Sequence, residues 1–337
     1  MPVLRKVISK LKLRASYGQV GNANLGGRRF AYLSTITDDY ETLNMYKWGL
    51  DSSYGLTGMA EGEFAVQDLT WEIVNKMNLG VELGFLNGMI DLQLDYFDER
   101  RKDIFMPRES VPMTAGFMKQ PWKNFGKVTN QGVEVSLNVN KQFGKDLFVS
   151  LMGTFTYAHN EITEKDEPSA VVGTNRAETG HPVGQLTGYI AEGLFTADDF
   201  EDVSTGKLKE GIPTQSFVGK LRPGDIRYRD VNGDGKVDVF DKSPIGGTKD
   251  PEIVYGFGLN MKYKNLDFGA LFQGIGRSWN ILGSSIIPGA NRGVTGNMFT
   301  NANDRWTVDN PSQNVFYPRL DDGINSNNNQ PSTWWLR

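Results

Sequence analysis

The chain has 337 residues, with 36 lysines and arginines against 40 aspartates and glutamates and a formal net charge of -4 at pH 7. This balance excludes the concentrated basic face that nucleic-acid binding needs, so we expect no nucleic-acid partner. With a hydrophobic content of 39% and a mean hydropathy of -0.42, the sequence holds no apolar run near the roughly 20 residues of a spanning helix. The 39 glycines indicate many strands joined by turns. The lack of cysteine excludes disulfides and thiolate metal sites.

The first residues predict a strand and no signal peptide. MPVLRKVISKLKLRAS carries basic residues but no apolar core followed by a small-residue cleavage site. Leu11, Leu13 and Tyr17 alternate with polar residues, which predicts a strand from near the start. A second short strand is expected at Phe30 to Ile36, and the polar, glycine-dotted residues 37–67 predict a long loop with brief strands.

The clearest alternation belongs to a predicted β-hairpin. Its first strand runs from Trp71 to Phe85, and its second has Ile90 to Tyr96 with apolar and charged residues on opposite faces. Asn87-Gly88 between them is a strong hairpin signal, because both residues of a type I′ turn take positive φ. Strands of a soluble sandwich run about five or six residues, so strands well over ten favour a transmembrane barrel.

The same unit recurs twice along the chain. One hairpin is expected around the turn Phe143 to Asp146, and another around Lys264-Asn265. Between the hairpins lie long polar stretches, including residues 160–220 and 283–329, and functional residues are often concentrated on such loops. Tight turns that alternate with long loops are typical of outer-membrane barrels. Aromatic girdles at the membrane interfaces are expected from tyrosines near strand ends and from the tryptophans Trp48, Trp71, Trp122, Trp279, Trp306, Trp334 and Trp335.

The polar faces of these strands predict a solvated barrel lumen. The residues that fit this face are Glu82, Asp91, Gln93, Asp95, Glu134, Asn138 and Asn140. Inside a barrel, water and other protein groups satisfy such side chains. Most of them would serve only to keep that face soluble.

Residues 225–245 are interpreted as an acidic, calcium-loop-like insertion in an external loop. The oxygen-ligand positions are filled by Asp230, Asn232, Asp234, Asp238 and Asp241, with Lys236 contributing its backbone carbonyl. A Ca²⁺ ion there would brace the loop. The open alternative is a polar turn without metal, in which Gly233 and Gly235 supply backbone freedom.

Catalytic chemistry finds little support in this sequence, and we expect no enzyme. His159 and His181 are the only histidines, which excludes a zinc site built from several imidazoles. No nucleophile-elbow motif accompanies them. No catalytic residue is therefore proposed.

A series of short motifs occurs in a fixed order along nearly the whole chain. They are Leu11–Gly18 with Gly21-Asn22, Trp71-Glu72 with Asn78–Glu82, Asp95–Phe97, Asn130–Glu134, Gly180–Gly184 with Gly188-Tyr189 and Gly193–Phe195, Pro223–Asp241, Phe272–Gly274, Asp304–Trp306 and Pro318–Leu320. In this order they resemble the C-terminal half of the β-barrel of SusC/RagA-type TonB-dependent outer-membrane transporters. The most specific part is the acidic block that runs into a hairpin and then Phe272-Gln-Gly.

The resemblance implies an all-β fold: a partial antiparallel transmembrane β-barrel with long extracellular loops, residues 1–337 forming part of a 22-stranded plugged barrel. The plug and the last strands of the family are not matched, so a fragment is expected. It also implies an outer-membrane importer of glycan oligomers or peptides, working with a SusD-like surface lipoprotein, the TonB system and outer-membrane lipid.

Two alternatives stay open at this point. The first is a calcium-braced extracellular adhesin or binding module, in which the same strands form a soluble sandwich. The second, less favoured, is a cell-surface glycoside hydrolase, for which 40 acidic residues offer carboxylate pairs by chance. A sandwich would pack its apolar faces on each other, whereas a barrel leaves them facing outward.

Overall fold

The computed structural model describes residues 7–37, 46–48, 54–56, 59–116, 119–282, 299–321 and 325–337. No helix within these ranges is long and apolar enough to cross a membrane. The chain divides into two compact units. Unit 1 comprises Met1–Val172, Ala177–Val183 and Glu252–Gly276, and unit 2 comprises Gly173–Arg176, Gly184–Pro251 and Arg277–Arg337.

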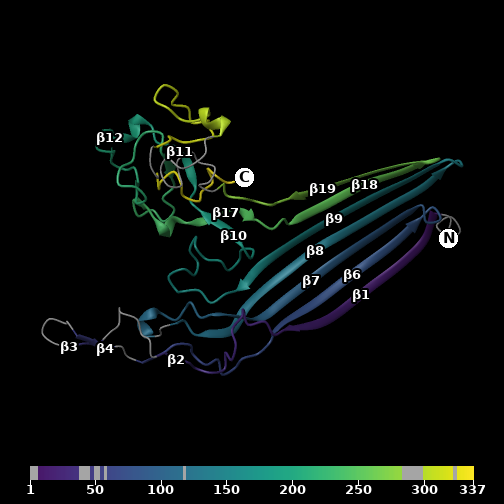
Figure 1. Cartoon of the computed structure of the whole chain (residues 1–337), viewed down its shortest axis with the longest axis horizontal. Coiled ribbons are helices and arrows are strands. Elements are labelled where there is room, and N and C mark those ends of the chain that lie inside the picture. Colours follow the sequence, from purple (N-terminus) through teal and green to yellow (C-terminus); the bar gives the residue numbers. More distant parts are fainter. Residues whose placement is uncertain are drawn as a thin grey trace. The chain divides into compact units, whose positions relative to one another are not determined.

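Unit 1 is built on one antiparallel sheet of seven strands in the order β1-β6-β7-β8-β9-β18-β19 (Figure 1). These strands are β1 (Ile8–Asn22), β6 (Glu72–Phe85), β7 (Ile90–Pro107), β8 (Trp122–Phe143), β9 (Leu147–Glu164), β18 (Ile253–Tyr263) and β19 (Leu266–Gly276). The longest, β8, has 22 residues. Lengths beyond ten residues, predicted from the alternation, are therefore confirmed.

Smaller elements complete unit 1. They are β2 (Ile36–Thr37), β3 (Tyr46–Trp48), β4 (Tyr54–Leu56), β5 (Ala60–Glu61) and the 3₁₀ helix η1 (Met113–Ala115). The short strand predicted at Phe30 to Ile36 is wrong, because only its last residue enters β2. Phe30 has a φ of 57°, a left-handed conformation that ends an extended run.

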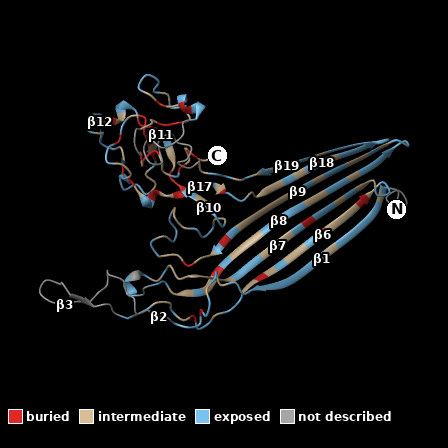
Figure 2. Ribbon diagram, in the orientation of Figure 1, coloured by how far each residue is buried: buried red, intermediate tan, exposed pale blue. Residues whose placement is uncertain are grey.

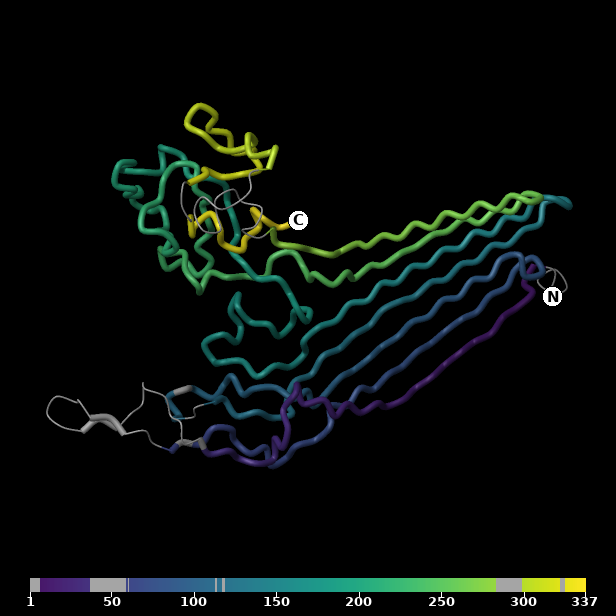
Figure 3. The backbone as a smooth tube through the Cα atoms, viewed as in Figure 1, coloured from purple at the N-terminus to yellow at the C-terminus, as the bar shows by residue number. Residues whose placement is uncertain are grey.

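The predicted tight turns are confirmed. Between β6 and β7, Asn87 and Gly88 have φ values of 57° and 83°. Between β18 and β19, Lys264 has a φ of 55°, and Tyr263 pairs directly with Leu266. The backbone tube shows each strand returning beside its predecessor after such a turn (Figure 3). Turn chemistry read from the sequence thus fixes the register of both hairpins.

The register places like residues in rows across the whole sheet. One row joins Leu13, Val81, Leu94, Val135, Phe155 and Tyr255 through consecutive strands. These side chains are not covered: Leu13 is 74% exposed and Leu94 38% exposed. Figure 2 shows the large sheet mostly in the exposed and intermediate colours. Because the apolar face is open, the described residues form no second sheet packed on it, such as the soluble-sandwich alternative requires.

Unit 2 contains short strands and single-turn helices around its own core. The elements are β10 (Gln185–Gly188), β11 (Ala191–Leu194), η2 (Ala197–Asp199), β12 (Phe200–Asp202), β13 (Lys207–Leu208), β14 (Thr214–Gln215), β15 (Ile226–Tyr228), β16 (Lys236–Val237), η3 (Val239–Asp241), β17 (Ser243–Thr248) and η6 (Thr300–Asn303). The buried core consists of Tyr189, Leu194, Ile226, Tyr228, Val237, Trp306, Tyr317 and Trp335. Residues 184–220 and the described residues 299–321 and 325–329 are therefore parts of one packed body, whereas residues 160–172 and 177–183 belong to unit 1.

The expected tryptophan girdle needs correction at Trp306, Trp335 and Trp334, the last of which packs against the core of unit 2. Trp306 and Trp335 are only 7% and 1% exposed, because they form the core of unit 2. The Trp335 indole donates to the Asn328 carbonyl at 2.8 Å, so its polar atom is satisfied without a membrane interface. Trp71, by contrast, is 63% exposed at the end of the sheet beside β6. The side chain of Trp48 and the loop residues 283–298 and 322–324 lie outside the described residues.

Candidate functional site

The face opposite the apolar rows carries an ion-pair network that starts on β1. Lys10, Lys12 and Arg14 project from alternate positions of that strand toward one carboxylate, Glu82 on β6. The distances to the Glu82 oxygens are 2.7 Å from Lys10 Nζ, 3.1 Å from Lys12 Nζ and 3.2 Å from Arg14 Nε. The predicted polar face is thus a real, charged surface of the sheet.

Arg14 joins this network to the next strands. Its Nη2 donates to both oxygens of Asp95 on β7 at 2.8 Å, and Gln93 Nε2 donates to the same carboxylate at 2.9 Å. The Arg14–Asp95 pair lies directly over Gly80 of β6, where any Cβ would overlap the Asp95 carboxylate. Only glycine leaves that space, so Gly80 is a condition for the pair.

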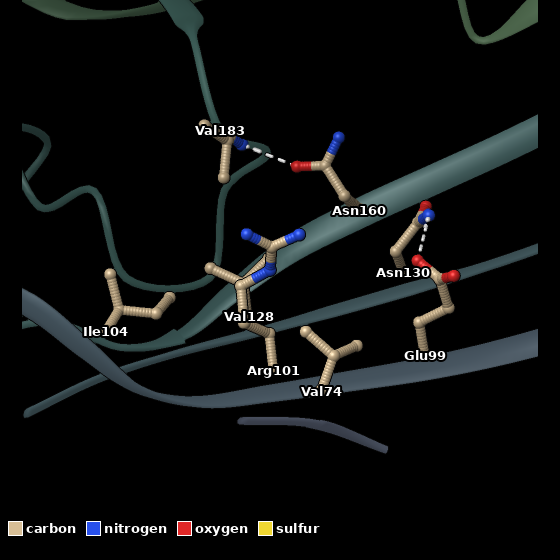
Figure 4. A pocket seen from close by; sticks show the side chains of 8 residues that line it. All are labelled: Val74, Glu99, Arg101, Ile104, Val128, Asn130, Asn160 and Val183. Atoms are coloured by element: carbon tan, nitrogen blue, oxygen red, sulfur yellow. Dashed lines mark hydrogen bonds between the residues drawn. The ribbon is translucent and has the colours of Figure 1, made fainter. Parts of the chain in front are cut away.

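A pocket of about 460 Å³ lies on the same face, toward the far end of the strands from the tight turns (Figure 4). Its polar walls are Glu99 and Arg101 of β7, Asn130 of β8 and Asn160 of β9; its apolar walls include Val74 of β6 and Val128 of β8. The register of the strands explains why these residues lie together. Glu99, Asn130 and Asn160 are paired across adjacent strands in one row, and Val74, Arg101 and Val128 are paired in the next. The pocket is therefore built mainly by four adjacent strands, with Val183 added from the segment that follows them.

The polar side chains of this pocket use only some of their hydrogen-bonding atoms in contacts with other described residues. Asn160 Oδ1 accepts from the Val183 amide at 2.7 Å, Arg101 Nη1 lies 2.6 Å from Glu72, and Asn130 Nδ2 donates to Glu99 at 3.4 Å. Next to Arg101 the register of β7 shifts, and Asp103 takes a φ of 58°. Such a bulge bends the strand and re-aims side chains. Sequence reasoning missed this pocket, because no single segment contains it.

The predicted calcium-loop residues lie together in unit 2, and their oxygens accept from the loop's own backbone. Asp230 accepts from the Gly233 and Gly235 amides at 2.6 and 2.8 Å. Asp241 is fully buried and accepts from the Val231 and Asp238 amides, each at 2.8 Å. The loop geometry is thus held by carboxylates.

The remaining loop residues form similar local bonds. Asn232 accepts from the Asp234 amide at 3.0 Å, and Asp234 from the Lys236 amide at 2.9 Å. Asp238 accepts from the Phe240 amide at 2.8 Å and caps η3. Among the described residues, no three or more His, Cys, Asp or Glu side chains are placed to hold a metal ion. Calcium binding by this loop stays a prediction.

A buried carboxylate outside the predicted site organises unit 2. Asp225 is fully buried, and its Oδ1 accepts from Arg319 Nε at 3.1 Å, Asn325 Nδ2 at 2.9 Å and Asn328 Nδ2 at 3.0 Å. Its Oδ2 accepts from the Arg222 amide at 2.9 Å. Burial raises the pKa of Asp225, and the Arg319 guanidinium opposes that shift. The Pro223-Gly-Asp segment, quoted above only as a motif, therefore has a structural role.

The two histidines are separated in the structure. His159 lies on β9, and its Nδ1 is 2.6 Å from Glu252 Oε1. The carbonyl of His181 accepts from the Ile162 amide at 2.9 Å, which adds the segment before Val183 to the edge of β9. The contacts of both histidines hold neighbouring segments together, and neither contact pairs a histidine with a nucleophile.

Long antiparallel strands with an open apolar face and a charged opposite face define the wall of a transmembrane β-barrel. Comparison with known families agrees: the model described as "TonB dependent receptor-like, beta-barrel" matches residues 4–244. The chain belongs to this family, whose members are transporters of the outer membrane and not enzymes. The predicted all-β fold and family are confirmed.

Relatives of the SusC/RagA type cover most of the chain. It is 28% identical over 322 residues to TonB-dependent receptor P26 of Formosa agariphila, covering 92% of this chain and 30% of the receptor. It is 29% identical over 280 residues to TonB-dependent receptor SusC of Bacteroides thetaiotaomicron, covering 78% and 24%. The chain thus spans less than a third of the length of these relatives.

A solved structure shares the fold. The RagAB peptide transporter superimposes with a TM-score of 0.66 at 23% identity, covering 98% of this chain and 32% of that one. At this identity the likeness shows the fold alone. It extends beyond the seven-stranded sheet to nearly all of the chain.

Proposed function

We propose that this protein imports an oligomeric nutrient, a glycan or a peptide, across the outer membrane. The proposal rests mainly on the two faces of the sheet, which presents rows of exposed apolar side chains on one side and the Arg14, Glu82 and Asp95 network on the other. Such a wall separates lipid from a polar interior. Family membership supports the transport role, since the relatives are TonB-dependent receptors.

The proposal includes two protein partners. The first is the TonB system, which supplies energy to receptors of this family. The second is a SusD-like surface lipoprotein that covers the barrel and helps to capture cargo. Similarity to SusC and to RagAB, which is described as a peptide transporter, supports such a partner here.

Deletion of the gene in the bacterium that produces the protein tests this function. We expect uptake of one class of oligomer, labelled oligosaccharides or labelled peptides, to be lost, while uptake of the corresponding monomer is kept. Restoring the gene should restore uptake. Normal uptake of both classes in the deletion strain would contradict the proposal, and impaired surface attachment with normal uptake would favour the adhesin alternative.

The acidic loop contributes to this proposal as a brace. If it binds Ca²⁺, the ion would stiffen a segment of unit 2 and take no part in chemistry, because its predicted ligands already shape the loop backbone. Calcium would then affect transport only by ordering this loop.

A further inference from the structure

From the pocket on the polar face we propose a binding subsite for the carboxyl end of a peptide, with Arg101 as its carboxylate-binding group. This inference rests on the proposed import function and narrows its cargo. A volume of about 460 Å³ falls within the roughly 300–1,000 Å³ of small-molecule sites. The pocket therefore has room for a short peptide end.

The cationic group is available in this pocket. Arg101 Nη1 contacts Glu72 at 2.6 Å, but its other guanidinium nitrogens have no hydrogen-bond partner among the described residues. The Glu72 contact fixes the guanidinium in place (Figure 4 shows Arg101 among the lining side chains). A planar guanidinium offers a fork of donors that matches a carboxylate.

Two asparagines supply groups that fit a peptide backbone. The Val183 amide fixes Asn160 Oδ1, and this leaves Asn160 Nδ2 as a donor with no described acceptor. Asn130 donates to Glu99 and keeps its Oδ1 as an acceptor with no described donor. One donor and one acceptor on adjacent strands can bind a peptide C=O and N–H.

The apolar walls favour a peptide over a glycan. Val74, which is 6% exposed, and Val128 are aliphatic, and none of the residues that line the pocket is aromatic. The C–H face of a sugar ring packs best on the negative π face of an aromatic ring, which is missing from these walls. Aliphatic walls instead gain by burying an aliphatic side chain.

Binding to the intact transporter purified from outer membranes tests the subsite. The probes are penta-alanine, its C-terminal amide and maltoheptaose, titrated by calorimetry. We expect the free acid to bind at least tenfold more tightly than the amide. Arg101→Gln should remove this difference, and maltoheptaose should not compete. The comparison of acid and amide needs no mutation, so it stands even if a variant assembles poorly.

Matched variants separate the subsite from structural effects. Glu72→Gln breaks the same ion pair but keeps the guanidinium, and Arg100→Gln removes the neighbouring cation, which is exposed and paired with Asp98. Both should keep the preference for the acid. Asn160→Asp keeps the acceptor for Val183, loses the donor and adds a negative charge, so it should weaken binding of both probes and of the acid more than of the amide.

Two outcomes would overturn the subsite. Arg101→Gln that still discriminates acid from amide would show that Arg101 does not bind the carboxylate. Binding of maltoheptaose that displaces penta-alanine would assign the pocket to sugars. Either result leaves the import function intact, because that function is judged separately by uptake in the deletion strain.

Discussion

Arg319 and Asp225, 94 positions apart in the sequence, form an ion pair in the core of unit 2, with Arg319 Nη2 3.0 Å from Asp225 Oδ1. The carboxylate is fully buried and the Arg319 side chain is 15% exposed. Asn325 and Asn328 donate to the same oxygen. One aspartate therefore links its own segment to residues 319–328, in a body that has little regular secondary structure.

Asp225→Asn should destabilise unit 2 by about 3–5 kcal/mol, because it removes the fully buried counter-charge of Arg319 and leaves only its outer partner, Asp321. Thermal unfolding of the intact protein, followed by fluorescence of the core tryptophans Trp306 and Trp335, would measure the loss. The control is Asp321→Asn, which removes the outer, 29% exposed partner of Arg319 and should cost about 1 kcal/mol or less. Equal effects of the two variants would contradict this account of the core.

Gly274→Ala should lower the thermal stability of the barrel. A Cβ at Gly274 would overlap the ring of Tyr255 on the paired strand, so the ring would have to leave its place. The control is Gly153→Ala on the same sheet, where a Cβ meets nothing within 4 Å. We expect that variant to be neutral or slightly stabilising, since alanine restricts the unfolded chain. The temperature at which the detergent-solubilised protein changes its electrophoretic migration measures the stability of each variant. A larger loss of stability from Gly153→Ala than from Gly274→Ala would contradict this prediction.

Acid should loosen the loops at the end of β7 and β9. Burial alone would raise the pKa of Asp166, but the Arg108 guanidinium and the Ser110 amide and hydroxyl hold it below its ordinary value. A carboxyl with a lowered folded-state pKa adds stability above its unfolded pKa of about 3.9, and this is lost as the pH falls through the folded pKa.

The difference in melting temperature between the native protein and Asp166→Asn checks this pH dependence. It should be present at neutral pH and shrink as the pH drops below about 4. A difference that stays constant down to strong acid would mean that the carboxylate charge is not what pins Arg108 and Ser110.

Calcium binding by the acidic loop can be decided by titration. If the loop is a metal site, Ca²⁺ added to the intact, chelator-treated protein should give saturable heat that Asp234→Ala removes. Asp234 is chosen because its side chain is on the exposed part of the loop, whereas Asp241 is buried and holds the backbone. Asp202→Ala, at a carboxylate outside the loop, is the control. If the native protein gives no heat on titration, the metal-site prediction is wrong, and the loop is the metal-free polar turn that the sequence also allows.

The hairpins were predictable because their determinants are local. Alternation over Leu79 to Phe85, turn residues such as Asn87-Gly88 and strand length together specify a strand, its partner and its outward face. The resemblance of ordered motifs supplied the family, which periodicity alone does not give.

The core of unit 2 was not predictable from local pattern. Its members come from segments such as Ile226–Tyr228, a strand of three residues that is too short to establish a period of two. Others come from irregular segments such as Trp306 to Tyr317, where no period marks the buried residues. For this reason the sequence pattern wrongly predicts membrane-interface positions for Trp306 and Trp335. The pocket is not predictable from the sequence, because only the register of three strands brings Glu99, Asn130 and Asn160 together.

The central claim, that this sheet is a membrane wall with its apolar rows toward lipid, is tested most directly by spin labels. The chain has no cysteine, so single cysteines at consecutive positions of β7 around Gln93 and Leu94 can be labelled in the reconstituted protein. Labels at Leu92 and Leu94 should be relaxed by oxygen, which concentrates in lipid, and labels at Asp91 and Gln93 by a water-soluble nickel complex. Equal accessibility to the nickel complex at all four positions would contradict the barrel wall.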